Sequence, residues 1–454
     1  MKRLFLIVLS LIVIFVARAQ VSTEFTQTIN GVTLTYNIID QANRHVEVTT
    51  IRNPHLLTPP ILTFPEAVYK PGETEPYTIT RIVKKQGSWN YTDINDPGTI
   101  TLIFPSSLET IGDMGFAHSY GVDVVDLSKC TKLKELVSLN FHRSSISKLY
   151  LPEGLETIGE LTFDDTPYLK ELTIPSTIKR LEGSAFDHEE NLKVVDMHKV
   201  PAVPTQSSAP GSPFSNAHPD LKIYVNTDLT ALYATAPGWS DDKGKYAEKI
   251  DMNATGYTTF YLENENFKVP DGCTAYIITG VTPSGNIATP DNAIVKAFTA
   301  GKIIPKQTGF ILQGTPNTTI EYRAAVTGIE EDVTGNLLVG TATEREISGA
   351  GYKYYVLSNS GDQGLGFYKQ GTRGGASIKL KAHRAGLRLT ESIARAKSFF
   401  IDFDAARENA NVAGIRNIGQ EAEGRDNVIY DLQGRRVKNP THGIYIINGK
   451  KVIK

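Results

Sequence analysis

The chain has 454 residues, of which 40% are apolar and 21% are charged, with 38 Gly and 23 Pro. This length exceeds one ordinary core, so we expect two or three domains, and the Gly and Pro content favours short strands and turns over long helices. The formal net charge of −2 gives no support for nucleic-acid binding.

The N-terminus has the parts of a secretory signal peptide. Lys2 and Arg3 precede an unbroken apolar run from Leu4 to Val16, and small residues surround Arg18 at its exit. The run is shorter than the about 20 residues that a membrane-spanning helix needs. We therefore predict a signal peptide at residues 1–19, a secreted or cell-surface location, and no transmembrane segment after cleavage.

A short motif repeats along the middle of the first half of the chain. Apolar strands end at positions spaced 23, 24, 23 and 23 residues apart, and two aliphatic residues and a Phe follow in four units. The period predicts a leucine-rich-repeat solenoid, in which parallel strands stack and the Phe fills the core behind them. The strand ends are Pro105, Ser128, Pro152, Pro175 and His198, and the aromatic positions are Phe116, Phe141, Phe163 and Phe186.

The wording of the repeat resembles the BspA-like, or treponemal-type, leucine-rich repeats of bacterial surface proteins. The match is carried by "LPEGLETIGELTFDDTPYLKELTIP" and "IPSTIKRLEGSAFDHEENLKVVDM". Glu182 stands where the family tends to have Ile, and the unit from Ser128 lacks the Pro and has two extra residues before Leu133. An opening hairpin at "NGVTLTYNIID" and a closing repeat at "LKIYVNTDLTALYATAPGWSD" extend the expected repeat domain over residues 20–250.

After residue 250 the period disappears. Short alternating strands separated by Gly, Pro and Asn predict an all-β, sandwich-like or barrel-like domain over residues 251–404. The order of its strands resembles a β-domain found downstream of repeats in secreted proteins of the Bacteroidota type, which implies no enzymatic role. Residues 405–424 have the polar composition of a flexible linker. The predicted fold class is therefore mainly β.

The last segment, residues 425–454, alternates as a short β-hairpin and is rich in basic residues. It resembles the C-terminal sorting domain of the type IX secretion system, which implies recognition by that secretion machinery. A structural β-cap without a sorting role is the alternative. The matching positions are Tyr430, Asp431, Gly434, Arg435, Gly443, Tyr445, Gly449, Lys450 and Lys451.

Sequence signatures of catalysis are absent. The chain has no G-x-S-x-G elbow, no phosphate-binding loop, no H-E-x-x-H and no C-x-x-C. We therefore predict no enzyme activity, no catalytic residues and no cofactor. Cys130 and Cys273 fall in different predicted domains, so we expect buried free thiols rather than a disulfide.

Imidazoles and carboxylates follow the repeat Phe in successive units. Stacking would place them along one rim of the solenoid, where carboxylates and imidazoles are able to bind a divalent ion. Solvated turns explain the same residues without an ion, and we predict no metal site. These residues are His118, His142, Asp164, Asp165, Asp187 and His188.

The outward side of the repeat strands is the predicted recognition surface. If Leu172 and Ile174 point inward, alternation turns their neighbours outward, and solenoids use such faces to bind proteins or glycans. We predict a non-catalytic adhesin that binds a protein or glycan of a host or bacterial surface. The alternative is a glycan-binding accessory protein in polysaccharide capture. The predicted surface consists of Ile103, Val124, Asp126, Lys148, Tyr150, Glu171, Thr173 and Asp196.

Overall fold

The computed structural model describes residues 23–52, 56–83, 99–207, 211–285, 289–361, 364–394 and 398–410, and four short strands after residue 428. The predicted signal peptide lies outside the described residues, as do Asp431, Gly434, Arg435, Gly443 and Gly449. The structure is mainly β, which confirms the predicted fold class. Among the described helices, none has both the length and the apolar character needed to cross a membrane.

The chain forms two compact units. Unit 1 contains Met1–Leu169 and Ala185–Glu189, and unit 2 contains Lys170–Ser184 and Glu190–Lys454. Cys130 in unit 1 and Cys273 in unit 2 are both buried free thiols, as predicted.

Unit 1 opens with an antiparallel hairpin. Asn30 and Gly31 both have positive φ, 48° and 86°, as a tight turn that matches the strand twist requires. The hairpin continues into a sheet in which later strands pair in parallel. Its order is β1 (Glu24–Ile29), β2 (Val32–Asp40), β3 (His45–Arg52), β5 (Thr78–Ile82) and β7 (Thr110–Ile111).

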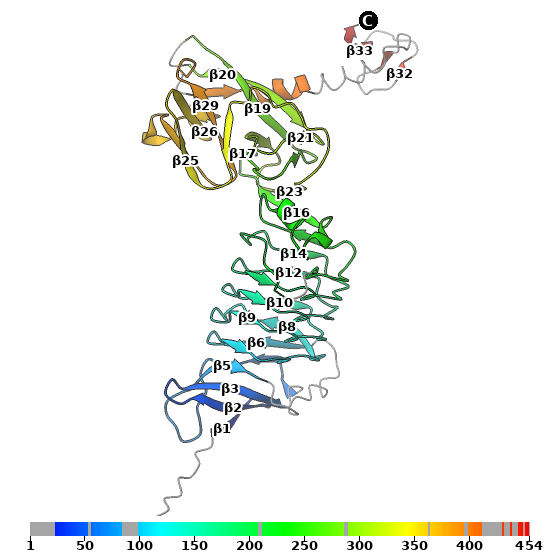
Figure 1. Cartoon of the computed structure of the whole chain (residues 1–454), viewed down its shortest axis with the longest axis vertical. Coiled ribbons are helices and arrows are strands. Elements are labelled where there is room, and N and C mark those ends of the chain that lie inside the picture. The colour runs from blue at the N-terminus through cyan, green and yellow to red at the C-terminus, as the bar shows by residue number, and fades with distance from the viewer. Residues whose placement is uncertain are drawn as a thin grey trace, which may run out of the picture. The chain divides into compact units, whose positions relative to one another are not determined.

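A parallel sheet of unit 1 carries the outward strand face (Figure 1). Leu102, Val125 and Leu149 point into the core at the middle of three successive strands, with at most 7% of each side chain exposed. Their neighbours along each strand point outward. The sheet contains β4 (Ile61–Thr63), β6 (Ile100–Ile103), β8 (Val122–Asp126) and β10 (Lys148–Tyr150), and a second parallel pair is β9 (Glu135–Leu136) with β11 (Thr157–Ile158).

A column of phenylalanines forms the centre of the repeat core. Phe116, Phe141, Phe163 and Phe186 are fully buried, and successive rings stack at centroid distances of 5.3, 5.2 and 5.0 Å. The residues two before and two after each Phe have positive φ, so each of these four repeats makes the same pair of left-handed turns. The backbone N–H groups of Phe116, Phe141 and Phe163 donate to carbonyls of the following repeat at 2.8 Å. The regular backbone thus gives each Phe the same position.

Unit 2 contains a parallel sheet that ends in one antiparallel strand. β12 (Glu171–Thr173), β14 (Val194–Asp196), β15 (Lys222–Tyr224) and β16 (Tyr246–Asp251) pair in parallel, and β23 (Thr319–Tyr322) closes the sheet. β16 crosses the predicted domain boundary at residue 250. It therefore belongs at once to the closing repeat and to the sheet that receives a strand from the all-β segment.

The all-β segment is built on one nine-stranded sheet. Two apolar clusters lie on it, one around Phe260, Phe267 and Phe310 and the other around Tyr276 and Phe399. The strand order is β17 (Tyr257–Phe260), β22 (Phe310–Gln313), β19 (Thr274–Thr282), β20 (Asp291–Thr299), β30 (Ser398–Ile401), β27 (Gly364–Tyr368), β26 (Tyr352–Gly361), β29 (Arg384–Thr390) and β24 (Leu338–Thr341). Smaller pairs are β18 (Phe267–Lys268) with β21 (Ile303–Ile304) and β25 (Arg345–Ser348) with β28 (Ser377–Leu380).

The C-terminal part has two further features. Residues 403–410 are helical, so a helix occupies the start of the segment that the composition assigns to a linker. Four short strands form an antiparallel sheet in which the last two make a hairpin. They are β32 (Arg436–Val437), β31 (Ile429–Tyr430), β33 (Ile444–Ile447) and β34 (Lys450–Ile453) in sheet order.

Candidate functional site

The outward strand face of unit 1 consists of two rows of side chains. Parallel pairing sets Ile103, Asp126 and Tyr150 in one register row and Thr101, Val124 and Lys148 in the other. In-register neighbours on parallel strands lie about 4.8 Å apart, so each row is a continuous strip. Five predicted surface residues are therefore brought together here: Ile103, Val124, Asp126, Lys148 and Tyr150.

Tyr150 is the most prominent side chain of this face. It is 51% exposed, whereas Ile103, Val124 and Asp126 are half-buried. The Asp126 carboxylate accepts hydrogen bonds from the backbone N–H and the hydroxyl of Ser128 at 2.9 and 2.6 Å, which fixes its position. The face thus combines a rigid scaffold, an exposed aromatic ring and a fixed carboxylate.

The predicted residues of unit 2 have a different environment. Glu171 and Thr173 are exposed and lie in register with Val194 and Asp196. Asp196 accepts a hydrogen bond from Lys249 Nζ at 3.2 Å and contacts the ring of His198. Burial raises the pKa of Asp196, but these hydrogen bonds outweigh it and hold the pKa below its ordinary value.

The same ion network continues through residues that the motif did not single out. Lys249 Nζ lies 3.6 Å from the ring centre of Tyr224, and Glu321 pairs with Lys222 at 2.8 Å. The Tyr224 hydroxyl also donates to Glu321 at 2.8 Å. These groups neutralise one another, so this part of the strand face offers little unpaired charge to a ligand.

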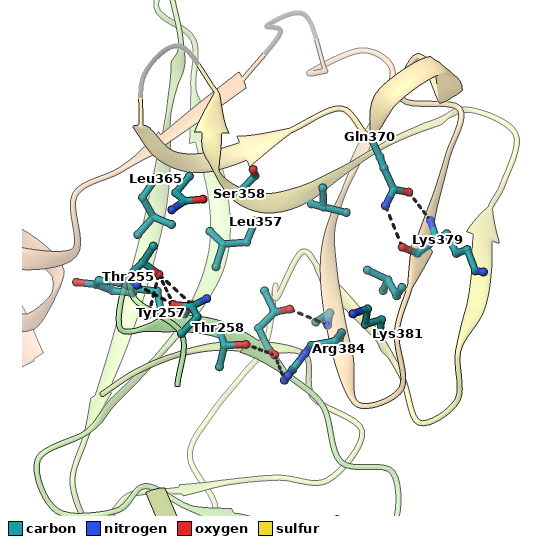
Figure 2. A pocket seen from close by; sticks show the side chains of 16 residues that line it. Thr255, Tyr257, Thr258, Leu357, Ser358, Leu365, Gln370, Lys379, Lys381 and Arg384 are labelled. Carbon is teal, nitrogen blue, oxygen red and sulfur yellow. Dashed lines mark hydrogen bonds between the residues drawn. The ribbon is translucent and has the colours of Figure 1, made fainter. Parts of the chain in front are cut away.

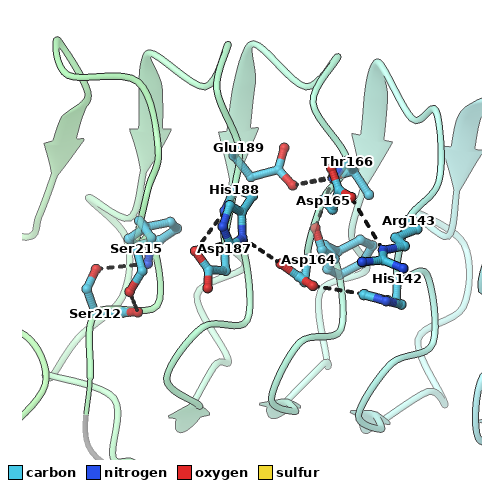
Figure 3. A network of polar contacts seen from close by, with 12 residues as sticks. His142, Arg143, Asp164, Asp165, Thr166, Asp187, His188, Glu189, Ser212 and Ser215 are labelled. Atoms are coloured by element: carbon cyan, nitrogen blue, oxygen red, sulfur yellow. Dashed lines mark hydrogen bonds and ion pairs between the residues drawn. The ribbon is translucent and has the colours of Figure 1, made fainter.

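The rim residues of unit 1 form a ladder of imidazole–carboxylate contacts (Figure 3). His142 Nδ1 lies 2.9 Å from Asp164 Oδ2, and His188 Nδ1 lies 3.2 Å from Asp164 Oδ1 and 3.3 Å from Asp187 Oδ1. The hydrogen bond with Asp164 raises the pKa of His188 above its ordinary value. His118 packs edge-on to His142 at 5.5 Å, and Arg143 Nε lies 3.5 Å from Asp165 Oδ2.

The ladder contains the residue types that bind metal ions, but its arrangement is explained without an ion. Ligand atoms of Asp164, Asp187 and His188 all lie within 4.8 Å of one another, which is close enough for a single ion. Each of these carboxylates already faces an imidazole, so the pairing accounts for the arrangement without an ion. The absence of a metal site stays a prediction.

A polar cavity of about 390 Å³ lies in the all-β segment (Figure 2). Its lining includes the cations Lys379, Lys381 and Arg384 and no Asp or Glu. Residues from β17, β26, β28 and β29 meet there, so neither a motif nor a spacing reveals it. The basic run "IKLKAHRAGLRL" was the one available signal.

A second feature that the sequence does not reveal is a group of buried acids beside β16. Glu248 is fully buried and accepts hydrogen bonds from the Asp228 N–H at 2.9 Å and from the Tyr322 hydroxyl at 2.5 Å. Glu265, 1% exposed, accepts one from the Ala231 N–H at 2.8 Å. Burial, and then the Glu248 charge, raise the pKa of Glu265 to about 9. Through Glu248, strand β16 is therefore hydrogen-bonded both to the backbone at Asp228 and to Tyr322 of β23.

Comparison with known proteins bears on the repeats. Four solved structures share 14 to 17% identity over 43 to 46% of this chain. A leucine-rich repeat protein of Treponema pallidum is matched over 85% of its length with a TM-score of 0.28, and one from Bacteroides ovatus over 70% with a TM-score of 0.18. The pneumococcal vaccine antigen PcpA is matched over 83% with a TM-score of 0.15. Scores this low carry no argument about this chain.

The amino-acid sequence itself identifies the type of repeat. No curated protein matches the chain significantly. Residues 92–201 match six copies of the BspA type leucine rich repeat region. The repeated motif of this chain is therefore of the BspA leucine-rich-repeat type, as its wording indicates.

Proposed function

We propose that this chain is a non-catalytic recognition protein of the cell surface, and that the strand face of unit 1 binds a protein ligand. The observation that carries the proposal is Tyr150, 51% exposed on a strand held in register with its neighbours. Rigid, exposed aromatic side chains are favoured anchors of protein interfaces because they bury a large area at low entropic cost. An adhesin on a host or bacterial surface is the form of this function that the repeat type favours.

Binding of the purified chain to arrays of matrix proteins and glycans tests this proposal. We expect saturable binding to a protein ligand and a loss of about tenfold or more in affinity for Tyr150→Ala, as truncating an interface anchor costs about 2 kcal/mol. Tyr168→Ala is the matched control, because Tyr168 is 49% exposed but lies in a turn outside the strands. Equal losses for both variants, or none for Tyr150→Ala, would contradict the role of the strand face.

We also propose that residues 425–454 direct export through type IX secretion machinery. The resemblance of Tyr430, Tyr445 and the Lys450–Lys451 pair to such tails supports this role. Deleting residues 425–454 in a bacterium with that machinery should leave a folded protein in the periplasm, as measured by fractionation and surface proteolysis. Normal surface display of the truncated chain would contradict this sorting role and support a structural cap instead.

Polysaccharide capture is the second candidate function. The cavity of the all-β segment, which is lined by three cations and no acid, is the observation in its favour.

A further inference from the structure

The cavity of the all-β segment lies between β17, an edge strand of the nine-stranded sheet, and β29, a later strand of the same sheet. Strand β17 pairs with β22 along one edge, and its other edge faces β29. Two hydrogen bonds join these strands at Thr259: Arg384 Nη1 donates to the Thr259 carbonyl and the Ala385 N–H donates to Thr259 Oγ1, both at 3.1 Å. The cavity of about 390 Å³ occupies the open part of this seam, within the range of small-molecule sites. We call it the seam cavity.

Charge in the seam cavity has one sign. Lys379, Lys381 and Arg384 contribute to the lining, and no carboxylate does. Glu344 pairs with Lys379 at 2.6 Å, but both side chains are 54% exposed, so the pair is weak and leaves the cavity positive. A cleft lined by charges of one sign concentrates ligands of the opposite sign. The ligand should therefore be an anion.

Arg384 indicates which kind of anion. Its side chain is half-buried, and burial lowers the pKa of its guanidinium. Nη1 is bonded to the Thr259 carbonyl, and no carboxylate of the described residues forms an ion pair with Arg384. A guanidinium has five N–H donors in a planar fork that matches a carboxylate. An incoming carboxylate would offset the cost of keeping this cation partly out of water.

The rest of the lining is suited to a polyhydroxylated ligand. Asn359 is exposed, and Leu357 and Leu365 supply apolar surface (Figure 2). The hydroxyls of Thr255 and Ser358 also line the cavity, where they bond to Asn253 at 2.6 Å and to Ser360 at 2.7 Å. Sugar rings carry hydroxyls at their edges and C–H groups on their faces, so they need this alternation of polar and apolar contacts.

The side chain of Gln370 keeps the basic end of the cavity in place. Its Nε2 donates to the Lys379 carbonyl at 3.1 Å and its Oε1 accepts from the Lys379 N–H at 2.7 Å. These two bonds fix the strand end that carries Lys379 and Lys381. The backbone that carries these two cations is therefore held in place before any ligand arrives, which lowers the entropic cost of binding.

We propose that the seam cavity binds a saccharide that carries a carboxylate group. The carboxylate would lie against Arg384 and Lys381, and the sugar hydroxyls against Asn359, Ser358 and Thr255. This site uses none of the residues of the strand face of unit 1, so a test of one proposal does not decide the other.

Calorimetric titration of the purified full chain tests the site with three probes: a disaccharide ending in glucuronic acid, its glucose-ending counterpart, and inorganic phosphate. We expect saturable binding of the acidic disaccharide and about tenfold or more weaker binding of the neutral one, since the neutral disaccharide lacks the carboxylate that accepts charged hydrogen bonds from these cations. Equal affinity for both disaccharides, or no binding of the acidic one, would overturn the proposal. Binding of phosphate alone would overturn it in favour of a general anion site.

Lys381→Glu is the decisive variant, because Lys381 is exposed and its replacement should leave folding intact. Its affinity for the acidic disaccharide should fall about tenfold or more. Lys268→Glu makes the same charge change at an exposed position of β18 outside the cavity, and should bind as the parent does. Undiminished binding by Lys381→Glu would exclude the seam cavity as the site.

Discussion

His188 and Asp164 come from successive repeats, and the identical left-handed turns bring their side chains to the same rim. The hydrogen bond with Asp164 raises the pKa of His188 above its ordinary 6.5. A raised histidine pKa contributes stability that is fully present below the ordinary value and is lost as pH rises through the raised one. The contribution is moderated by solvent, since the His188 side chain is 56% exposed.

Replacing Asp164 with Asn should therefore return the pKa of His188 towards 6.5, as followed by NMR titration of its ring. The free energy of unfolding should fall more at pH 5 than at pH 9, because only protonated histidine gains from the carboxylate. Asp165→Asn is the matched control, since Asp165 pairs with Arg143 and acts on His188 only weakly through space. A loss of stability that is the same at both pH values would show that Asp164 acts through packing alone.

The phenylalanine column is the element that joins one repeat to the next. Phe163 stacks on Phe141 and Phe186 at 5.2 and 5.0 Å and is fully buried. Phe163→Ala should lower the free energy of unfolding by about 3–5 kcal/mol, through lost burial and the cavity left behind. Urea unfolding measures this loss. Tyr168→Ala, in an exposed turn, should change it by less than about 0.5 kcal/mol, and a similar effect of both variants would contradict a core role.

Strands and core positions of the repeats were predictable because their period repeats one physical requirement. Each turn needs an apolar strand centre such as Leu149 and a Phe such as Phe163, and the structure buries both. The contacts of residues that depart from the repeat pattern could not be predicted in this way. Glu182 departs from the family pattern at the position that follows Leu181, 23 residues after Gly159, and its carboxylate accepts hydrogen bonds from the N–H and hydroxyl of Ser207 at 2.9 and 2.5 Å. That partner lies 25 residues along the chain in a segment without period.

The same distinction between local pattern and distant contact applies to the candidate sites. Alternation along a strand was enough to predict that Tyr150 and Lys148 point outward. The seam cavity and the Tyr224–Lys249–Glu321 network depend on strands that are distant in sequence. Their positions follow from the tertiary pairing of β15, β16 and β23 and from the hydrogen bonds between β17 and β29, which no local pattern encodes.

Strand β16 joins the closing repeat to the all-β segment. It pairs in parallel with β15 and antiparallel with β23, and its Glu248 holds the backbone of residues 228–230. Glu265 lies beside Glu248 without contact to water, and its pKa is raised from 4.5 to about 9. The folded chain therefore keeps a proton that the unfolded chain loses above pH 4.5. Stability should fall as pH rises between these values and level off above about 9.

Glu265→Gln replaces the protonated carboxyl with a neutral amide and should flatten this dependence. Relative to the parent, the variant should be more stable at pH 8.5 than it is at pH 5.5, as measured by urea unfolding of the full chain. Glu263→Gln, which removes an exposed acid two residues away, should keep the slope of the parent. A variant whose stability varies with pH as the parent's does would show that Glu265 is ionised in the folded chain.

The stacked repeats also bear on how this gene is able to change. An in-frame duplication of 23 codons, the spacing between Pro105 and Ser128, would supply one more strand, one more Phe and one more pair of left-handed turns. Such an insertion meets its neighbours on surfaces that they already use for each other, so it is tolerated where an arbitrary insertion is not. Strains should accordingly differ in this region by whole repeats, so the number of stacked strands becomes a heritable property of the protein.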